Sequence, residues 1–353
     1  MTKDKSIYIK NIYYMLSYAF QALRQENYDE IASESFEDAQ DLFAAILAKG
    51  VAKQLKQGLY REYIGKVESL PVLRGKLEMA GTIKHRLMRA QRLSCEFDEL
   101  SENNVFNQIL KTAMFYLVRD PSVKTDRKDS LKKNLVFFDP IDLLSLSEIP
   151  WNRLYFHRNS SDYELLMNLC YFVLQGQLQT TETGANRMLQ FSDDHMARLY
   201  ERFILEYFKQ HHNELDDVKA GAVDWRVDKE FNANQSYLLP SMQTDIMLTK
   251  NENTLIIDAK YYGRTLQQQF DKHSIHSGNI YQIFTYVKNY DKQDSGNVSG
   301  MLLYAKTDED ITPDMQVKIS GNVISARTLD LNCEFKELSR QLDSIVESWM
   351  NQQ

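Results

Sequence analysis

Two aspartates and a lysine in the second half of the chain have the types and spacing of a metal-dependent hydrolytic site. Asp258 and Lys260 lie two residues apart in the apolar run 255–260, which is typical of a strand. Because alternate residues of a strand share a face, both side chains point the same way. Asp245 lies in the preceding apolar run, and the polar break at residues 251–254 predicts a hairpin loop. The hairpin brings Asp245 opposite Asp258.

This arrangement fits the hydrolysis of a phosphodiester. Two carboxylates suit a hard cation such as Mg²⁺, which prefers oxygen ligands, and the carbonyl of Ala259 offers a further oxygen. Such a metal polarises the phosphate and lowers the pKa of an attacking water, while Lys260 stabilises the developing negative charge. The alternative is a solvated Asp–Lys pair, because Asp-x-Lys is common at strand ends.

A glutamine and a tyrosine follow at helical spacing. Gln282 and Tyr286 are four residues apart in a segment predicted to be helical, so they share one face of the helix. We expect them to orient Lys260 or to contact the phosphate backbone. The combination of two aspartates, a lysine and this helix favours a functional site over a solvated ion pair.

These residues resemble the PD-(D/E)XK nuclease superfamily, in the branch that carries a Gln-x-x-x-Tyr helix. Pro240 stands five residues before Asp245, so the literal Pro-Asp pair is absent. Further motifs make the chain similar to the McrC family, the nuclease subunit of McrBC modification-dependent restriction systems. These motifs occupy residues 11–16, 73–78, 95–104 and 199–203.

The resemblance implies a fold, a partner and one more site residue. The fold is α/β: a C-terminal nuclease-like mixed sheet flanked by helices, with an N-terminal, mainly helical α+β domain. The partner is a McrB-like hexameric AAA+ GTPase, which uses the GTP, reads double-stranded DNA with modified cytosine, and is stimulated by the docked N-terminal half. Glu201, in the motif at residues 199–203, would approach the metal from the first helix of the nuclease domain.

Composition agrees with a cytoplasmic protein that depends on a partner. The 353 residues carry a net charge of −7, so a DNA-binding protein acting alone, which normally has a basic face, is disfavoured. Positive charge gathers only locally, at residues 84–92 and 124–133, and solvated helix faces explain it. No secretory signal or membrane-spanning run is present. Three scattered cysteines predict free thiols in a reducing compartment.

Helical periodicity and polar stretches predict two domains. Residues 1–180 form a partner-docking domain, residues 181–353 form the endonuclease domain, and the polar stretch 175–194 is the linker. The alternating order of strands and helices after residue 194 is typical of an α/β domain.

Two other functions remain open. The chain is also compatible with a non-catalytic bridge that activates the GTPase and has a vestigial nuclease site. A free-standing DNA-repair nuclease would need a DNA-binding module of its own, and none is recognised. The Walker A pattern Gly-x-x-x-x-Gly-Lys-Ser/Thr is absent from this sequence, so we expect the motor to belong to the partner.

Overall fold

The computed structural model describes residues 9–20, 34, 36, 38–156, 161–183, 193–227, 237–261, 266–269, 272–306 and 312–352. The chain divides into two compact units. Residues Gln40–Glu182 form one, here called the helical unit. Residues Met1–Ala39 and Thr183–Gln353 form the other, here called the sheet unit. The sequence-based division at residue 180 lies close to the boundary at Thr183, but it placed residues 9–20 in the N-terminal domain, whereas these described residues group with the C-terminal half.

Packing of the first helix explains this difference. Helix α1 (Ile9–Ala19) contacts α8 (Asp193–His211) and α10 (Phe335–Met350). The buried Asn11 side-chain amide donates hydrogen bonds to the carbonyl oxygens of Leu331 and Cys333, both at 2.8 Å. The Tyr14 ring stacks on Phe335 with centroids 4.0 Å apart. The motif at residues 11–16 thus anchors the N-terminus to the sheet unit, a long-range pairing that helical periodicity cannot reveal.

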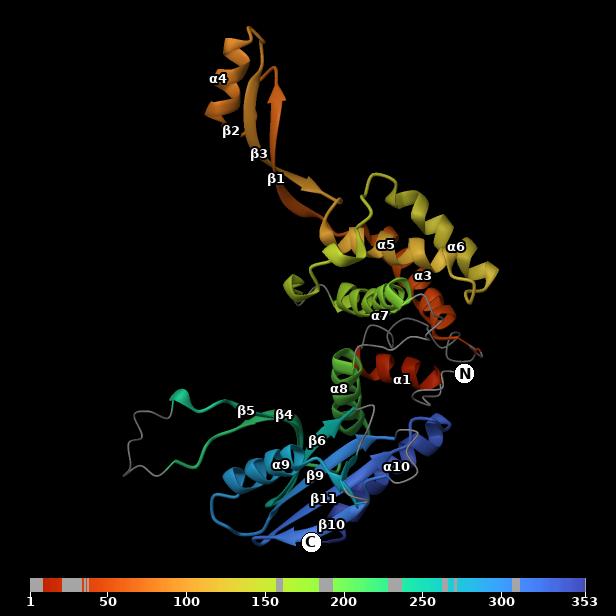
Figure 1. Ribbon diagram of the computed structural model, residues 1–353, viewed down its shortest axis with the longest axis vertical. Helices are drawn as coiled ribbons and strands as arrows, with labels where there is room; N and C mark the ends of the chain where they lie inside the picture. The colour runs from red at the N-terminus through yellow and green to blue at the C-terminus, as the bar shows by residue number, and fades with distance from the viewer. Residues whose placement is uncertain are drawn as a thin grey trace. The chain divides into compact units, whose positions relative to one another are not determined.

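Four longer helices build the body of the helical unit (Figure 1). They are α3 (Ala39–Gln57), α5 (Val105–Arg119), α6 (Thr125–Leu135) and α7 (Ser161–Thr183), with short 3-10 turns at Val136–Phe138, Leu146–Glu148 and Trp151–Arg153. Asp41 is buried and pairs with Arg127, whose Nε lies 3.0 Å from Asp41 Oδ1. Helix α7 continues to Thr183, so the predicted linker is helical over its first half.

An arm projects from these helices (Figure 1). We use "arm" for residues 62–101, which comprise β1 (Glu62–Leu70), β2 (Lys76–Leu77), α4 (Met79–Leu87) and β3 (Leu93–Ser101). The strands form an antiparallel sheet in the order β1-β3-β2. The basic stretch 84–92 begins inside α4, and the Glu78 carboxylate caps this helix by accepting from the Ala80 and Gly81 N–H groups.

Asparagines fix the base of the arm to the helical body. Asn104 caps α5 by accepting from the Asn107 N–H. The side-chain amides of Asn104 and Asn107 both donate to the carbonyl oxygen of Tyr60, at 2.8 Å each. The Tyr163 hydroxyl accepts from the Tyr60 N–H and donates to Asn107 Oδ1. Both strands that leave the body are therefore held by a buried polar network at the end of the motif 95–104.

A six-stranded mixed sheet forms the centre of the sheet unit, in the order β10-β11-β9-β6-β5-β4. Its strands are β4 (Asp217–Val223), β5 (Met242–Lys250), β6 (Asn253–Lys260), β9 (Val298–Ala305), β10 (Met315–Ile319) and β11 (Asn322–Leu329). Strand β9 is parallel to both β6 and β11, and the other pairs are antiparallel. A separate hairpin pairs β7 (Leu266–Gln269) with β8 (Lys272–Ile275).

Helices cover both faces of this sheet. Helix α9 (Ser277–Tyr290) connects β6 to β9 and packs on a buried cluster that includes Ile256, Leu302 and Ile324. The other face carries α10, whose Ile345 and Trp349 lie against Leu255. Helix α8 contacts β4, β5 and β6. The predicted fold class, an α/β mixed sheet flanked by helices with a mainly helical α+β unit beside it, is confirmed.

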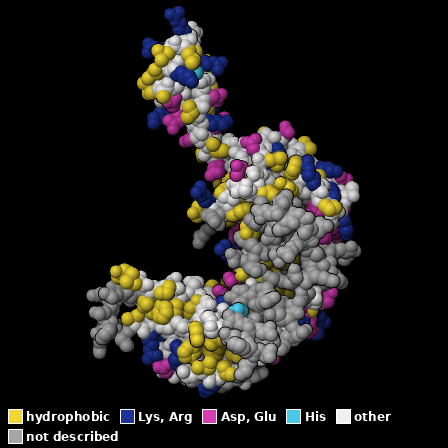
Figure 2. Space-filling model, viewed as in Figure 1, with side chains coloured by type: hydrophobic (Ala, Val, Ile, Leu, Met, Phe, Trp, Pro, Cys, Tyr) yellow, Lys and Arg dark blue, Asp and Glu magenta, His cyan; other side chains and the backbone are white. Residues whose placement is uncertain are grey.

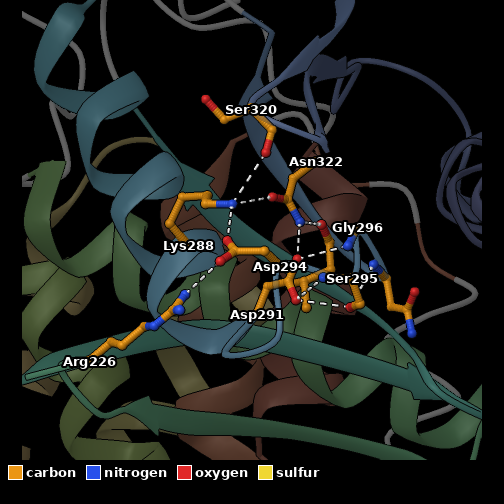
Figure 3. Close-up of polar contacts among 10 residues, drawn as sticks. Arg226, Lys288, Asp291, Asp294, Ser295, Gly296, Ser320 and Asn322 are labelled. Atoms are coloured by element: carbon orange, nitrogen blue, oxygen red, sulfur yellow. Dashed lines mark hydrogen bonds and ion pairs between the residues drawn. The ribbon is translucent and has the colours of Figure 1, made fainter. Parts of the chain in front are cut away.

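A polar network closes the end of the sheet where β6 and β9 begin (Figure 3). The buried Asp291 carboxylate accepts from the Ser295 N–H and hydroxyl, the Gly296 N–H and the Asn322 side chain. These donors hold the pKa of Asp291 down at about 2 although burial opposes the shift. Asp294 pairs with Lys288 and Arg226 beside it. This network fixes the turn between α9 and β9.

Membrane insertion has no support among the described helices. None of them combines the length and the apolar character that a bilayer-spanning segment requires.

Candidate active site

The two aspartates meet at the end of the central strands. Strands β5 and β6 pair in a register that sets Ile246 opposite Ile257, and the next residues outward are Asp245 and Asp258. Asp245 Oδ2 accepts a hydrogen bond from the backbone N–H of Ala259 at 2.8 Å. Asp258 is buried and Asp245 is half-buried. The hairpin predicted from the polar break at 251–254 therefore brings the two carboxylates together.

Burial and mutual repulsion perturb these acids. Loss of solvent, together with the nearby carboxylates of Asp258 and Glu201, raises the pKa of Asp245 to about 7. Burial also raises the pKa of Asp258, although the neighbouring Lys260 ammonium opposes this shift. Titratable groups that are buried together and repel each other are characteristic of functional sites, because folding alone does not favour such a cluster.

Lys260 joins the carboxylates to helix α9. Its Nζ lies 2.7 Å from Asp258 Oδ2 and donates to Gln282 Oε1 at 3.1 Å. Gln282 Nε2 in turn donates to the Tyr286 hydroxyl at 2.9 Å. The four-residue spacing of Gln282 and Tyr286 thus forms a hydrogen-bonded relay along one helix face, which ends on the Lys260 ammonium. This geometry matches the expectation that the pair orients Lys260.

Glu201 approaches the same site from α8. It is half-buried, and the pKa of its carboxyl is raised first by burial and then by the charge of Asp258, while Lys260 acts in the opposite direction. Helix α8 therefore directs a third carboxylate toward the aspartate pair. Its interaction with Asp258 and Lys260 is electrostatic, and no hydrogen bond links Glu201 to either of them in the described region.

The residues fit a hard divalent cation by their chemistry. Three carboxylates share a poorly hydrated region, where burial raises the pKa of each, and repulsion between carboxylates adds to the shift at Asp245 and Glu201. A bound cation would relieve that repulsion, and the Ala259 carbonyl would add an oxygen of the kind that Mg²⁺ prefers. Within the described ranges, no three His, Cys, Asp or Glu side chains are already gathered as tightly as a metal site needs. The metal roles of Asp245, Asp258, Ala259 and Glu201 remain predictions.

Each of these side chains could be predicted from the sequence, but the contact that holds the backbone beside Asp245 could not. Thr244 is buried beside Asp245, and its hydroxyl both donates to the Gly221 carbonyl and accepts from the Gly221 N–H. Periodicity gave no signal for this contact, because it joins two strands at an irregularity of the ladder.

A second surface feature lies on the arm. Figure 2 shows hydrophobic and basic side chains gathered there. Tyr63 is 72% exposed and Leu87 is 80% exposed, and other large apolar side chains of the arm are also exposed to solvent: Val67, Val72, Leu73, Met79, Ile83, Met88 and Leu100. Lys84, Arg86 and Arg89 lie among them on and after α4. An exposed apolar surface of this extent is typical of a protein-binding site.

Fold and site together define an α/β protein that carries a buried carboxylate–lysine cluster at the end of a mixed sheet. The chain matches the family model described as "McrBC 5-methylcytosine restriction system component" over residues 2–305. The match covers most of the sequence, and the chain belongs to this family.

Among the known relatives is the Type IV methyl-directed restriction enzyme EcoKMcrBC of Escherichia coli strain K12. It is 26% identical over 348 residues, which cover 97% of this chain and 98% of the relative.

Two solved structures from Thermococcus gammatolerans also match. One is a half-complex from a tetradecameric assembly of McrB AAA+ hexamers with bound McrC; it has a TM-score of 0.46, 19% identity, and coverage of 96% of this chain and 76% of that chain. The other is a McrBC complex, with a TM-score of 0.41, 21% identity, and coverage of 58% and 59%.

Proposed function

We propose that this chain is the Mg²⁺-dependent endonuclease subunit of a restriction complex that recognises modified cytosine, and that it hydrolyses phosphodiester bonds of double-stranded DNA in the cytoplasm. The observation that carries the proposal is the buried cluster of Asp245, Asp258 and Lys260, with Glu201 beside it. Membership of a restriction-system family supports it.

Each residue of the site has a distinct role in this proposal. Asp245 and Asp258 hold Mg²⁺, with the Ala259 carbonyl and Glu201 as further oxygen ligands. The metal supplies Lewis acidity toward the phosphate and toward water. Lys260 stabilises the negative charge that develops on the phosphate oxygens, because its ammonium is held close to Asp258 in a poorly hydrated site.

Helix α9 completes the site by holding that ammonium in place. Gln282 fixes Lys260 through the 3.1 Å hydrogen bond, and Tyr286 fixes Gln282.

The proposed partner is a McrB-like hexameric AAA+ GTPase, which reads the modified base and whose GTP hydrolysis this chain stimulates. The curated relative is a methyl-directed restriction enzyme, and in one similar structure McrC is bound to McrB AAA+ hexamers. We assign the docking role to the arm, because its exposed apolar side chains and neighbouring cations need a partner to cover them.

The deciding experiment measures cleavage of methylated and unmethylated plasmid by the chain, alone and with its partner GTPase, in the presence of Mg²⁺ and GTP. We expect cleavage of the methylated plasmid in the full mixture alone. Asp258→Ala should abolish cleavage and leave partner binding and GTPase stimulation intact. Asp294→Ala, which removes an exposed carboxylate from the network at the other end of the sheet, is the matched control and should cleave normally.

One observation favours a second candidate, a non-catalytic bridge that activates the GTPase. Among the described residues, no three potential ligands are preassembled around a metal position. Faster GTP hydrolysis without cleavage in the full mixture would support the bridge, and cleavage by the chain alone would support a free-standing nuclease.

A further inference from the structure

Strand β5 contains a bulge at the residue that carries the first catalytic carboxylate. Lys219 of β4 pairs with Met247 of β5, and Gly221 pairs with Thr244. Between these pairs, Ala220 alone stands opposite both Asp245 and Ile246. One extra residue is therefore inserted into β5 at Asp245, which is the definition of a β-bulge.

The bulge brings the residues before Asp245 onto the face that Asp245 occupies. Met242 and Met247 both belong to the buried cluster under α9. They are five positions apart, and an odd separation would put them on opposite faces of a regular strand. Asp245 is two positions from Met247 and shares its face by ordinary alternation, whereas only the bulge lets Met242, three positions before Asp245, share that face. On that face Asp245 lies beside Asp258, which alternates with the cluster member Ile256 along β6.

Two contacts hold the bulge in shape. The Thr244 hydroxyl donates to the Gly221 carbonyl at 2.9 Å and accepts from the Gly221 N–H at 3.2 Å, and Thr244 is only 1% exposed. A Cβ at Gly221 would lie 2.8 Å from the Met247 sulfur and 4.0 Å from Thr244 Oγ1, so a side chain here would press on the residue that follows the bulge. The two contacts act at the residue immediately before Asp245.

We propose that Thr244, clamped on the backbone of Gly221, is a positioning residue that fixes the bulge in β5 and thereby aims the Asp245 carboxylate at the metal position beside Asp258. The proposal rests on the proposed nuclease function. Thr244 touches neither metal nor substrate and acts only through Asp245. Residues that orient metal ligands in this way change metal affinity or activity by about 10–100-fold when they are replaced.

The test compares Mg²⁺ binding and Mg²⁺-dependent cleavage in matched variants. Calorimetric titration of the full chain with Mg²⁺ gives the dissociation constant, and cleavage of methylated plasmid with the partner and GTP gives the Mg²⁺ midpoint. Thr244→Val keeps the shape and removes the hydroxyl, and we expect both values to rise about tenfold or more. Thr244→Ser keeps the hydroxyl and should stay within about twofold of wild type.

Two further variants test whether the change in Mg²⁺ binding comes only from a general loss of stability. Thr249→Val makes the same chemical change in β5 beyond the bulge and should leave both values unchanged. Gly221→Ala keeps every hydrogen-bonding group but pushes a methyl against Met247, so it should raise the Mg²⁺ midpoint as well. It decides the question if Thr244→Val does not fold.

The outcomes separate this inference from the proposed function. Wild-type affinity and midpoint in folded Thr244→Val, or in Gly221→Ala where the valine variant is unfolded, would overturn the positioning role and leave the nuclease proposal standing. Equal loss in the Ser and Val variants would overturn it too, because the hydroxyl would then be irrelevant. Absence of Mg²⁺ binding and of cleavage in the wild type would overturn the proposed function, and the positioning role with it.

Discussion

Asp245 and Asp258 lie side by side in a region from which most water is excluded. Folding must bring these carboxylates close together and near Glu201, and the raised pKa values measure the cost. In the part of the chain that the structure describes, Lys260 opposes this charge, with its Nζ 2.7 Å from Asp258 Oδ2. The buried carboxylates therefore destabilise the fold, as expected where function opposes stability.

Substitution of Asp245 should reveal the unfavourable free energy of burying its charged carboxylate. The carboxyl pKa is about 7 in the folded chain and 3.8 in the reference state, so the folded chain binds the proton more tightly. Its contribution to the unfolding free energy is then fully present below about pH 4 and is lost as the pH rises through 7. Without metal at about pH 8, Asp245→Asn should be more stable than wild type by about 1–3 kcal/mol.

Urea unfolding in EDTA at about pH 5 and pH 8 checks this prediction. The advantage of the asparagine variant should shrink at the lower pH, since the wild-type carboxyl is then protonated. Saturating Mg²⁺ should stabilise the wild type and leave the variant unaffected. If the unfolding free energy of the wild type and of the variant depended equally on pH, the Asp245 carboxylate would not be the destabilising charge.

Local sequence rules predict some of the contacts in the site but not all of them. Period-two alternation placed Asp258 and Lys260 on one face, and helical spacing placed Gln282 and Tyr286 together; their contacts follow from those local rules. The same alternation places Asp245 on the face of Met247, two residues away, but it does not predict the bulge that brings Met242 to that face as well. The bulge is held by a hydroxyl bonded to another strand's backbone, and such a contact has no local signature.

At the scale of elements, helix α9 makes contacts at both ends of the sheet. Its first turns carry Gln282 to the site, while its last residue leads into the turn that Asp291 holds. The long helices α1, α8, α9 and α10 have apolar residues at helical spacing, and this periodicity predicts helices from the sequence alone. Helix α4 was missed because no residue of it is buried, so it has no apolar stripe facing a core.

Asp291 should be the main stabilising residue of that turn. It is 3% exposed and accepts from two backbone N–H groups and two side chains. Asp291→Ala would leave these donors unpaired in a buried position and should lower the unfolding free energy by about 2–4 kcal/mol. Asp294→Ala removes only exposed ion pairs and should cost about 0–1 kcal/mol.

Chemical denaturation of the two variants provides the comparison. Because α9 also positions Gln282, the same Asp291 variant should cleave more slowly only at temperatures near its unfolding transition. Similar losses of stability in both variants would mean that the network acts through surface charge alone.

At the scale of the molecule, the chain separates two tasks between two units. The sheet unit contains all the proposed catalytic residues and recruits the first helix of the chain through Asn11. The helical unit contributes the arm, whose base is fixed by the buried Tyr60–Asn107–Tyr163 network. Sequence patterns predicted one task for each half of the chain. The packing of α1 on α8 and α10 could not be foreseen, because it depends on contacts between residues 193 to 322 positions apart.

This division predicts opposite phenotypes for substitutions in the two units. Leu87→Asp places a charge on the exposed apolar surface of the arm, where the side chain is 80% exposed and contributes little to folding. Docking buries such a side chain, so the charge should weaken binding to the partner GTPase by about tenfold or more and reduce GTPase stimulation with it. Val136→Asp, on an equally open valine (72% exposed) outside the arm, is the control.

Partner titrations of Leu87→Asp, Val136→Asp and Asp258→Ala give three separable patterns. The arm variant should lose stimulation and cleavage together at low partner concentration and regain both when the partner is in excess, since its catalytic residues are intact. The Asp258 variant should bind and stimulate normally at every concentration without cleaving. Normal binding by Leu87→Asp, or equal weakening by Val136→Asp, would remove the arm as the docking element, because a charge on the arm would then matter no more than a charge elsewhere on the helical unit.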